Sequence, residues 1–254
     1  MSDEVVHYAV ERGIATITLD SPQNRNALSS QLVGEFSAHL QTASNDGDVR
    51  AVVLTHTGTT FCAGADLRES AAEGGPAKGT ARVINLLRGI VELPKPVVAS
   101  IDGNVRAGGM GIVGACDIVV AGPQATFALT EVRLGLAPAM ITLTLRGRLT
   151  ERALSRYYLT GETFDPATAQ AIGLITVAAA DPAAEVAAVC ENLRKGSPQG
   201  LAESKKLTTA MTLAAFDREA ADLQALSQRL FESEEAREGV LSFLEKRSPA
   251  WAVD

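Results

Sequence analysis

The stretch Phe61-Cys62-Ala63-Gly64-Ala65-Asp66-Leu67 follows a short apolar run from Ala51 to Leu54. Such a short apolar run is typical of a buried strand. The small residues of the later stretch leave space around the backbone, so that its N–H groups can approach a ligand oxygen closely. The sequence therefore predicts a buried strand that leads into a tight, ligand-facing turn.

Two further segments extend this pattern. Ala107-Gly108-Gly109-Met110-Gly111 is a second turn of small residues, and Glu131-Val132-Arg133-Leu134-Gly135 carries one acid. Cys116-Asp117-Ile118-Val119 lies between them and reads as the approach to another buried strand. Two small-residue turns and one acid suit a site in which backbone N–H groups stabilise negative charge on a ligand oxygen.

Strand and helix patterns alternate in the first part of the chain, which favours an α/β fold with a parallel sheet. The expected strands are 7–10, 14–19, 52–55, 97–101 and 118–121. The expected helices are 29–44, 82–92 and 109–116, and a loop is expected over 69–80. Beyond Leu149 the pattern is helical, with expected helices at 151–159, 166–172, 183–195, 201–209, 213–231 and 234–246.

Composition excludes several classes of protein. A formal net charge of −7 argues against nucleic-acid binding, which needs a basic face. Arg and Lys interrupt every apolar run, so no membrane span is expected. The three Cys and three His are scattered, which indicates neither a disulfide framework nor a metal site. The acidic start of the chain lacks the basic segment of a signal peptide, and a cytoplasmic protein is expected.

Taken in order, these segments resemble the enoyl-CoA hydratase/isomerase (crotonase) superfamily, from Ile14 to Trp251. The resemblance implies a crotonase (ClpP-like) β-β-α superhelix as the core, residues 1–195. It also implies a helical C-terminal region, residues 196–254, that packs a homotrimer or a hexamer built as a dimer of trimers. The partner expected from this likeness is an acyl-CoA thioester. Coenzyme A is then part of the substrate, and no separate cofactor is expected.

The resemblance also implies catalytic roles. By family position, the N–H groups of Ala65 and Gly108 form an oxyanion hole, and Glu131 is the general acid/base. The family's hydratases usually carry two glutamates; Glu131 fills the second position, and the first falls on Gly111, so that carboxylate is absent here. The leading interpretation is a lyase that adds water to a 2-enoyl-CoA. A double-bond isomerase and a non-catalytic acyl-CoA-binding paralogue stay open as alternatives.

Further residues match positions that bind substrate in the family. The matching residues are Arg25, Ala27, Ala63, Asp66, Leu67, Arg106, Met140, Phe243 and Lys246. Arg25 is expected near the nucleotide phosphates, and Asp66 is expected to brace the oxyanion turn. Phe243 and Lys246 match positions that touch the coenzyme A of a neighbouring subunit.

Two departures bear on the substrate. Residues 136–141, Leu-Ala-Pro-Ala-Met-Ile, replace a glycine-rich stretch and should narrow one apolar wall of the pocket. This feature, with Gly111, is similar to the bacterial methylglutaconyl-CoA hydratase branch. Arg106 stands where relatives often have an apolar residue, and its side chain has two possible roles. It either meets a carboxylate of the substrate or plays a structural role, paired with a nearby acid or extended to solvent.

Overall fold

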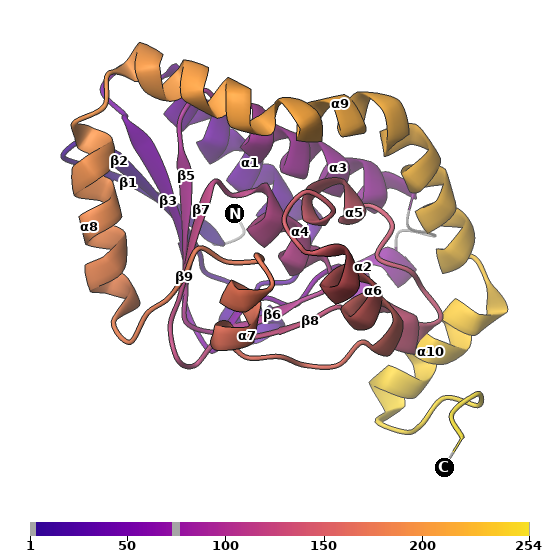
Figure 1. Ribbon diagram of the computed structural model, residues 1–254. Coiled ribbons are helices and arrows are strands. Elements are labelled where there is room, and N and C mark those ends of the chain that lie inside the picture. The colour runs from indigo at the N-terminus through magenta and orange to yellow at the C-terminus, as the bar shows by residue number, and fades with distance from the viewer. Residues whose placement is uncertain (1–3, 73–76, 254) are drawn as a thin grey trace.

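Figure 1 shows the computed structural model of the protein, which describes residues 4–72 and 77–253. The first sheet has the order β1-β2-β3-β5-β7-β9. Its strands are β1 (Val6–Glu11), β2 (Ile14–Leu19), β3 (Ala51–His56), β5 (Val97–Ile101), β7 (Ile118–Ala121) and β9 (Val177–Ala178). β1 and β2, both expected as strands, form an antiparallel hairpin, and every later pairing in this sheet is parallel.

A second, smaller sheet is parallel throughout and has the order β4-β6-β8. Its strands are β4 (Thr60–Cys62), β6 (Asn104–Arg106) and β8 (Thr126–Ala128). Each follows a strand of the first sheet within a few residues, and a helix comes after each pair. This β-β-α repeat winds the chain into a spiral, as Figure 1 shows.

Helices cover both faces of the first sheet. The first part of the chain contains η1 (Pro22–Asn24), α1 (Ser30–Asn45), α2 (Leu67–Ala72), α3 (Ala77–Glu92), α4 (Gly108–Ala115) and η2 (Glu131–Leu134). The later helices are α5 (Thr142–Leu145), α6 (Glu151–Thr160), α7 (Pro166–Ala171), α8 (Pro182–Arg194), α9 (Pro198–Phe231) and α10 (Glu234–Glu245). The main core lies against α1, α3 and α4, whereas α8 packs on the opposite face.

Side-chain caps explain where many of these helices begin. A Ser, Thr or Asp oxygen that accepts a first-turn N–H satisfies a donor with no partner inside the helix. Six helices begin after such a residue: Ser29, Thr150, Asp165, Asp181, Ser197 and Ser233. Ser29 is the first residue of the helix expected over 29–44, and it caps α1.

Two sequence-based expectations were wrong. A loop was expected over 69–80, but the described part of that stretch belongs to α2 and α3, and residues 73–76 lie outside the described residues. Two helices were expected over 201–231, yet α9 is one helix of 34 residues. The stretch between the two expected helices, Ala210 to Thr212, holds no Gly or Pro that would break a helix.

A buried ion pair fixes α9 to the core. The Lys205 ammonium lies 2.7 Å from the Asp117 carboxylate and donates to the carbonyls of Ile90 (2.9 Å) and Lys95 (3.1 Å). All three donors of the ammonium group are therefore used. Within the described ranges, no helix is both long enough and apolar enough to cross a bilayer.

Candidate active site

The site lies where three neighbouring strands end. Ala65 follows β4, Gly108 follows β6, and Glu131 follows β8. Because these strands are parallel neighbours, their carboxyl ends meet at one edge of the sheet, which is where open α/β sheets bind ligands. The second sheet therefore brings together the three segments that the sequence singled out.

The backbone N–H groups of Ala65 and Gly108 are close together and unused. A Cβ atom built on Gly108 would lie 3.8 Å from the Ala65 nitrogen. Neither N–H is a donor in the hydrogen bonds of the described residues. Gly108 begins α4, so its N–H has no partner inside the helix and lies at the positive end of the helix dipole. The pair can therefore bind one oxygen atom.

Strained backbone shapes this turn. Ala107 has a φ of +46°, a conformation that costs an L-residue free energy and is often kept at functional sites. Gly64, at a φ of +90°, is the residue opposite, and a Cβ built on it would lie 2.8 Å from the Ala107 Cβ. The Ala107 N–H donates to the Ala128 carbonyl at the end of β8. This bond ties the oxyanion turn to the segment that carries Glu131.

Glu131 is a buried acid whose carboxyl group has a free oxygen. Its side chain lines the cavity, the residue is 9% exposed, and Oε2 has no hydrogen-bond partner. Burial raises the pKa of Glu131 from 4.5 to about 7. A carboxyl group that titrates near neutral pH can both accept and return a proton. Among the described residues, no cluster of three His, Cys, Asp or Glu side chains could hold a metal ion.

Ile141 occupies the place of a second acid. A Cβ built on Gly111 would lie 2.5 Å from Ile141 Cγ2 and 3.1 Å from Leu87 Cδ1. Gly111 does not line the cavity, whereas the whole stretch from Leu136 to Ile141 does. The expected apolar wall is therefore present, and a side chain at position 111 would have to displace Ile141.

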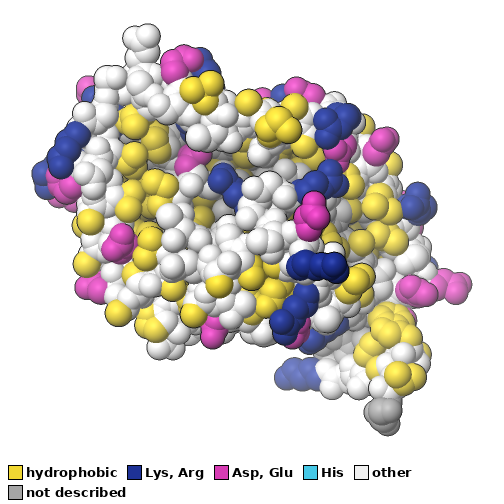
Figure 2. All heavy atoms as spheres, in the orientation of Figure 1, with side chains coloured by type: hydrophobic (Ala, Val, Ile, Leu, Met, Phe, Trp, Pro, Cys, Tyr) yellow, Lys and Arg dark blue, Asp and Glu magenta, His cyan; other side chains and the backbone are white. Residues whose placement is uncertain are grey.

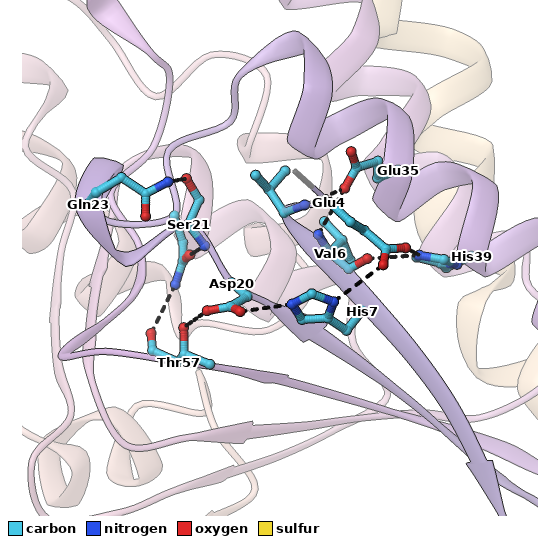
Figure 3. A network of polar contacts seen from close by, with 11 residues as sticks. Glu4, Val6, His7, Asp20, Ser21, Gln23, Glu35, His39 and Thr57 are labelled. Atoms are coloured by element: carbon cyan, nitrogen blue, oxygen red, sulfur yellow. Dashed lines mark hydrogen bonds and ion pairs between the residues drawn. The ribbon is translucent and has the colours of Figure 1, made fainter. Parts of the chain in front are cut away.

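A network of polar contacts holds the loop that leads to Arg25. The Asp20 carboxylate accepts hydrogen bonds from the Thr57 hydroxyl (2.5 Å) and the His7 ring (2.8 Å), as Figure 3 shows. These two donors hold the pKa of Asp20 below its usual value. Asn26, fully buried, accepts from the Ser21 N–H and donates to the Thr60 carbonyl. The loop is thus fastened to the segment between β3 and β4.

The cavity collects nearly all the residues expected to touch substrate. It has a volume of about 540 Å³, within the range of small-molecule sites. Its lining includes Ala65, Gly108, Glu131, Arg25, Ala27, Ala63, Asp66, Leu67, Arg106, Met140 and Phe243. Lys246 does not line it and instead ends α10 in a left-handed conformation. Phe243 was expected to touch the coenzyme A of a neighbouring subunit, but it lines the cavity of its own chain.

Arg106 has the structural role of its two interpretations, although its partners are neither an acid nor solvent. Its guanidinium group donates to the carbonyls of Val105 (2.9 Å) and Thr126 (2.8 Å). It also donates to the side chains of Asn104 (3.3 Å) and Thr126 (2.8 Å). Four of its five N–H donors are therefore used within the second sheet, on neutral acceptors. The expectation that Arg106 meets a substrate carboxylate is not supported, because these donors already have partners.

Asp66 braces its turn. One carboxylate oxygen accepts from the N–H groups of Arg68 and Glu69 (both 3.0 Å), and the other accepts from the Asn24 amide (2.7 Å). These bonds join the start of α2 to the Arg25 loop. They leave Glu131 as the one carboxyl group of the cavity lining without such contacts.

The match to known proteins spans the chain. The profile of the enoyl-CoA hydratase/isomerase family matches residues 9–253. The chain belongs to this family. An enoyl-CoA hydratase structure from Mycobacterium avium is 54% identical, with 98% of this chain and 100% of that chain covered and a TM-score of 0.93. The 2,3-dehydroadipyl-CoA hydratase of Escherichia coli is 30% identical over 242 residues, covering 94% of this chain and 95% of that protein.

Membership of the enoyl-CoA hydratase/isomerase family confirms the predicted fold class, a crotonase β-β-α spiral with a helical C-terminal region. A carnitinyl-CoA hydratase structure from M. avium has the same fold, with a TM-score of 0.86 at 28% identity over 98% of this chain and 99% of that chain. Sequence reasoning missed the buried Asn26, the strain at Ala107 and the packing of Ile141 against Gly111. Asn26 lies beside the predicted Arg25, but no pattern in the sequence pointed to the strain or to this packing.

Proposed function

We propose that the protein is an enoyl-CoA hydratase, a lyase that adds water across the Cα–Cβ double bond of a 2-enoyl-CoA thioester. The observation that carries the proposal is the free, buried Oε2 of Glu131 in a cavity with two unused N–H donors. The family match and the hydratases among the relatives support the same reaction. A non-catalytic paralogue would have no use for a carboxyl group kept buried at this cost.

In this mechanism, the N–H groups of Ala65 and Gly108 bind the thioester carbonyl oxygen. Ionised Glu131 takes a proton from water as the water oxygen bonds to Cβ, and the electron pair of the double bond moves to the carbonyl oxygen. The enolate is stabilised by donors that are oriented before the reaction, a large source of catalysis. Protonated Glu131 then returns the proton to Cα. Glu131 performs both transfers, since Ile141 fills the place of a second acid.

The test of this assignment is Glu131→Gln. The amide keeps the size of the side chain but cannot exchange a proton in these steps, so turnover of crotonyl-CoA should fall by about a hundred-fold or more. Loss of the enoyl absorbance measures turnover, and binding of a saturated acyl-CoA measures the intact site. A variant that binds and turns over at the wild-type rate would sink the assignment.

A second candidate is the isomerase that moves a double bond between Cβ–Cγ and Cα–Cβ. The single acid favours it, because one carboxyl group that carries a proton between Cγ and Cα is enough. A substrate panel separates the two reactions. A hydratase consumes 2-enoyl-CoA and forms a 3-hydroxy product, whereas an isomerase converts 3-enoyl-CoA and leaves 2-enoyl-CoA unhydrated.

The proposed substrate is an acyl-CoA with an uncharged acyl group. Arg25 and Arg68 are exposed cavity residues, and neither forms an ion pair among the described residues, so both are available to phosphates. Their position matters on a chain with a net charge of −7. Toward the acyl side the lining is apolar, from Leu136 to Ile141. Because four of the five donors of Arg106 are used, Arg106 itself gives no reason to prefer an acidic acyl group.

We further propose a homotrimer or a dimer of trimers that works in the cytoplasm without a separate cofactor. Addition of water is redox-neutral, and the activating thioester arrives with the substrate. Leu207 and Met211 support self-association, since they are 82% and 84% exposed and lie one helical turn apart on α9. Three buried free cysteines, Cys62, Cys116 and Cys190, fit a reducing compartment.

A further inference from the structure

The last helix of the chain packs on the short helix that carries the acid. α10 contacts η2, and both supply residues to the wall of the cavity. Figure 2 shows hydrophobic side chains gathered at the α10 end of the molecule, where Leu241, Phe243 and Leu244 are about half exposed. None of the steps of the proposed hydration uses α10, so its contact with η2 needs its own explanation.

Two glycines bring the backbones of the two helices together. A Cβ atom built on Gly239 of α10 would lie 2.5 Å from the carbonyl carbon and oxygen of Leu134. In return, a Cβ built on Gly135 would lie 2.6 Å from the carbonyl carbon of Glu235 and 2.9 Å from the nitrogen of Ala236. Non-bonded carbon atoms prefer separations of about 3.5 to 4.0 Å, so only glycine permits this approach.

Because backbone atoms touch directly here, no flexible side chain can move to accommodate a displacement of α10. η2 is only four residues long, from Glu131 to Leu134, and Gly135 ends it in a left-handed conformation. One end of η2 continues from β8, and the other end rests on α10. Any movement of α10 against Leu134 is therefore passed to the helix that begins with Glu131.

We propose that α10 positions the acid, and that Gly239 is the residue through which it does so. The proposal rests on the assigned role of Glu131 in the hydration. Gly239 lies in the wall of the cavity, but no step of this scheme gives it a contact with the reacting atoms. It acts through η2, which it holds at a fixed distance so that the Glu131 carboxyl group stays beside the two N–H donors.

The pKa of Glu131 can report a displacement of α10, because it depends on the charges and the water around this side chain. The ionisable side chains that face it or share its cavity are Tyr158 on α6, Arg133 on η2, Arg106 on β6, Asp66 and Arg68 at α2, Arg25 after η1, and Arg247 after α10. None of them forms an ion pair with Glu131, and burial is the main cause of its raised pKa. Displacement of α10 admits water, so the pKa of Glu131 should fall from about 7 toward 4.5.

The decisive variant is Gly239→Ala in the full-length protein. Relief of a 2.5 Å contact requires a shift of about 1 Å, and a misplacement of that size can lower a rate by about a hundred-fold. We expect kcat on crotonyl-CoA to fall by about ten- to a hundred-fold, KM to change less, and the acid limb of the pH profile to move to lower pH. Gly34→Ala is the matched control, since a Cβ there has no atom within 4 Å.

A second variant avoids the steric clash. Ser233 caps α10 by accepting from the Ala236 N–H, so Ser233→Ala loosens the first turn of α10, which rests on Gly135. It should move the acid limb in the same direction as Gly239→Ala. A folded Gly239→Ala or Ser233→Ala protein with a lower melting temperature, but the wild-type kcat and pH limb, would reduce the contact to ordinary packing and overturn the proposal. Normal turnover by Glu131→Gln would instead overturn the proposed function, and the two failures are thereby distinguished.

Discussion

At the scale of single residues, the proposed chemistry depends on a carboxyl oxygen of Glu131, Oε2, that has no hydrogen-bond partner. A hydrogen bond or a cation beside Oε2 would favour the ionised form and lower its pKa. The described surroundings supply neither, and burial alone dominates. The two backbone donors likewise lack partners, and the hydrogen bond from the Ala107 N–H to the Ala128 carbonyl helps to hold their turn in place. The site thus holds polar groups whose partners arrive with the substrate.

The raised pKa predicts how the rate depends on pH. The proposed reaction starts with ionised Glu131, so protonation removes the active form. The value of kcat/KM should therefore be constant at alkaline pH and fall about ten-fold per pH unit below about 7. Initial rates of crotonyl-CoA hydration from pH 5 to 9 measure this limb. A rate that stays constant down to pH 5 would show that Glu131 ionises at its ordinary value or does not act as the base.

At the scale of elements, α9 depends on one buried contact. Lys205 on α9 reaches Asp117, which also accepts a hydrogen bond from the Val97 N–H (2.8 Å). The contact joins a helix from the last quarter of the chain to the start of β5 and β7. Sequence periodicity does not reveal it, because a lysine in a helix is usually exposed.

Lys205→Met should therefore destabilise the fold. The substitution leaves the Asp117 carboxylate buried without its cation, and it removes the donor from the carbonyls of Ile90 and Lys95. Loss of one partner of a buried pair costs about 3 to 5 kcal/mol. Urea unfolding measures the change in the free energy of unfolding. Lys206→Met is the matched control, because the Lys206–Glu203 pair is largely exposed. Its loss should change the free energy of unfolding by less than about 1 kcal/mol. Equal effects of the two substitutions would refute the anchoring role.

The sequence predicted what depends on local pattern and motif order. The cap at Ser29, the strands around Val53 and Val98, and the two small-residue turns follow from neighbouring residues. The acceptors of Arg106 and the packing of Ile141 against Gly111 join residues that are distant in sequence, and no local signal specifies them. The contact of Gly239 with Leu134 is of the same kind. For this reason the positions of the site residues were predictable, but the partners of their side chains were not.

At the scale of the whole molecule, the exposed face of α9 bears on assembly. Leu207 and Met211 carry large apolar side chains into solvent in the single chain, and a neighbouring subunit would cover them at a gain of about 25 cal/mol per Å² of apolar surface. Lys246 does not line the cavity of its own chain, which is compatible with the expected contact to the coenzyme A of a neighbouring subunit.

Light scattering should therefore give three or six times the mass of one chain at micromolar concentration. Charges on the exposed stripe should prevent assembly, so the double variant Leu207→Glu, Met211→Glu should scatter as a monomer. Lys206→Glu, at an exposed position about 100° around the same helix from Leu207, should keep the assembled mass. A wild-type protein that scatters as a monomer would contradict the proposed assembly, with Lys246 then only a charge at the end of a helix.

The packing of Ile141 into the space beside Gly111 restricts how this site can evolve. A glutamate at position 111 would first meet Ile141 Cγ2 and overpack the core, at a cost of about 1 to 3 kcal/mol. Shortening Ile141 to alanine first would leave a cavity that costs about 2 to 5 kcal/mol. Either order of the two substitutions passes through a less stable protein. A chain with this pair therefore loses stability before it gains a second acid, which favours retention of the one-acid site.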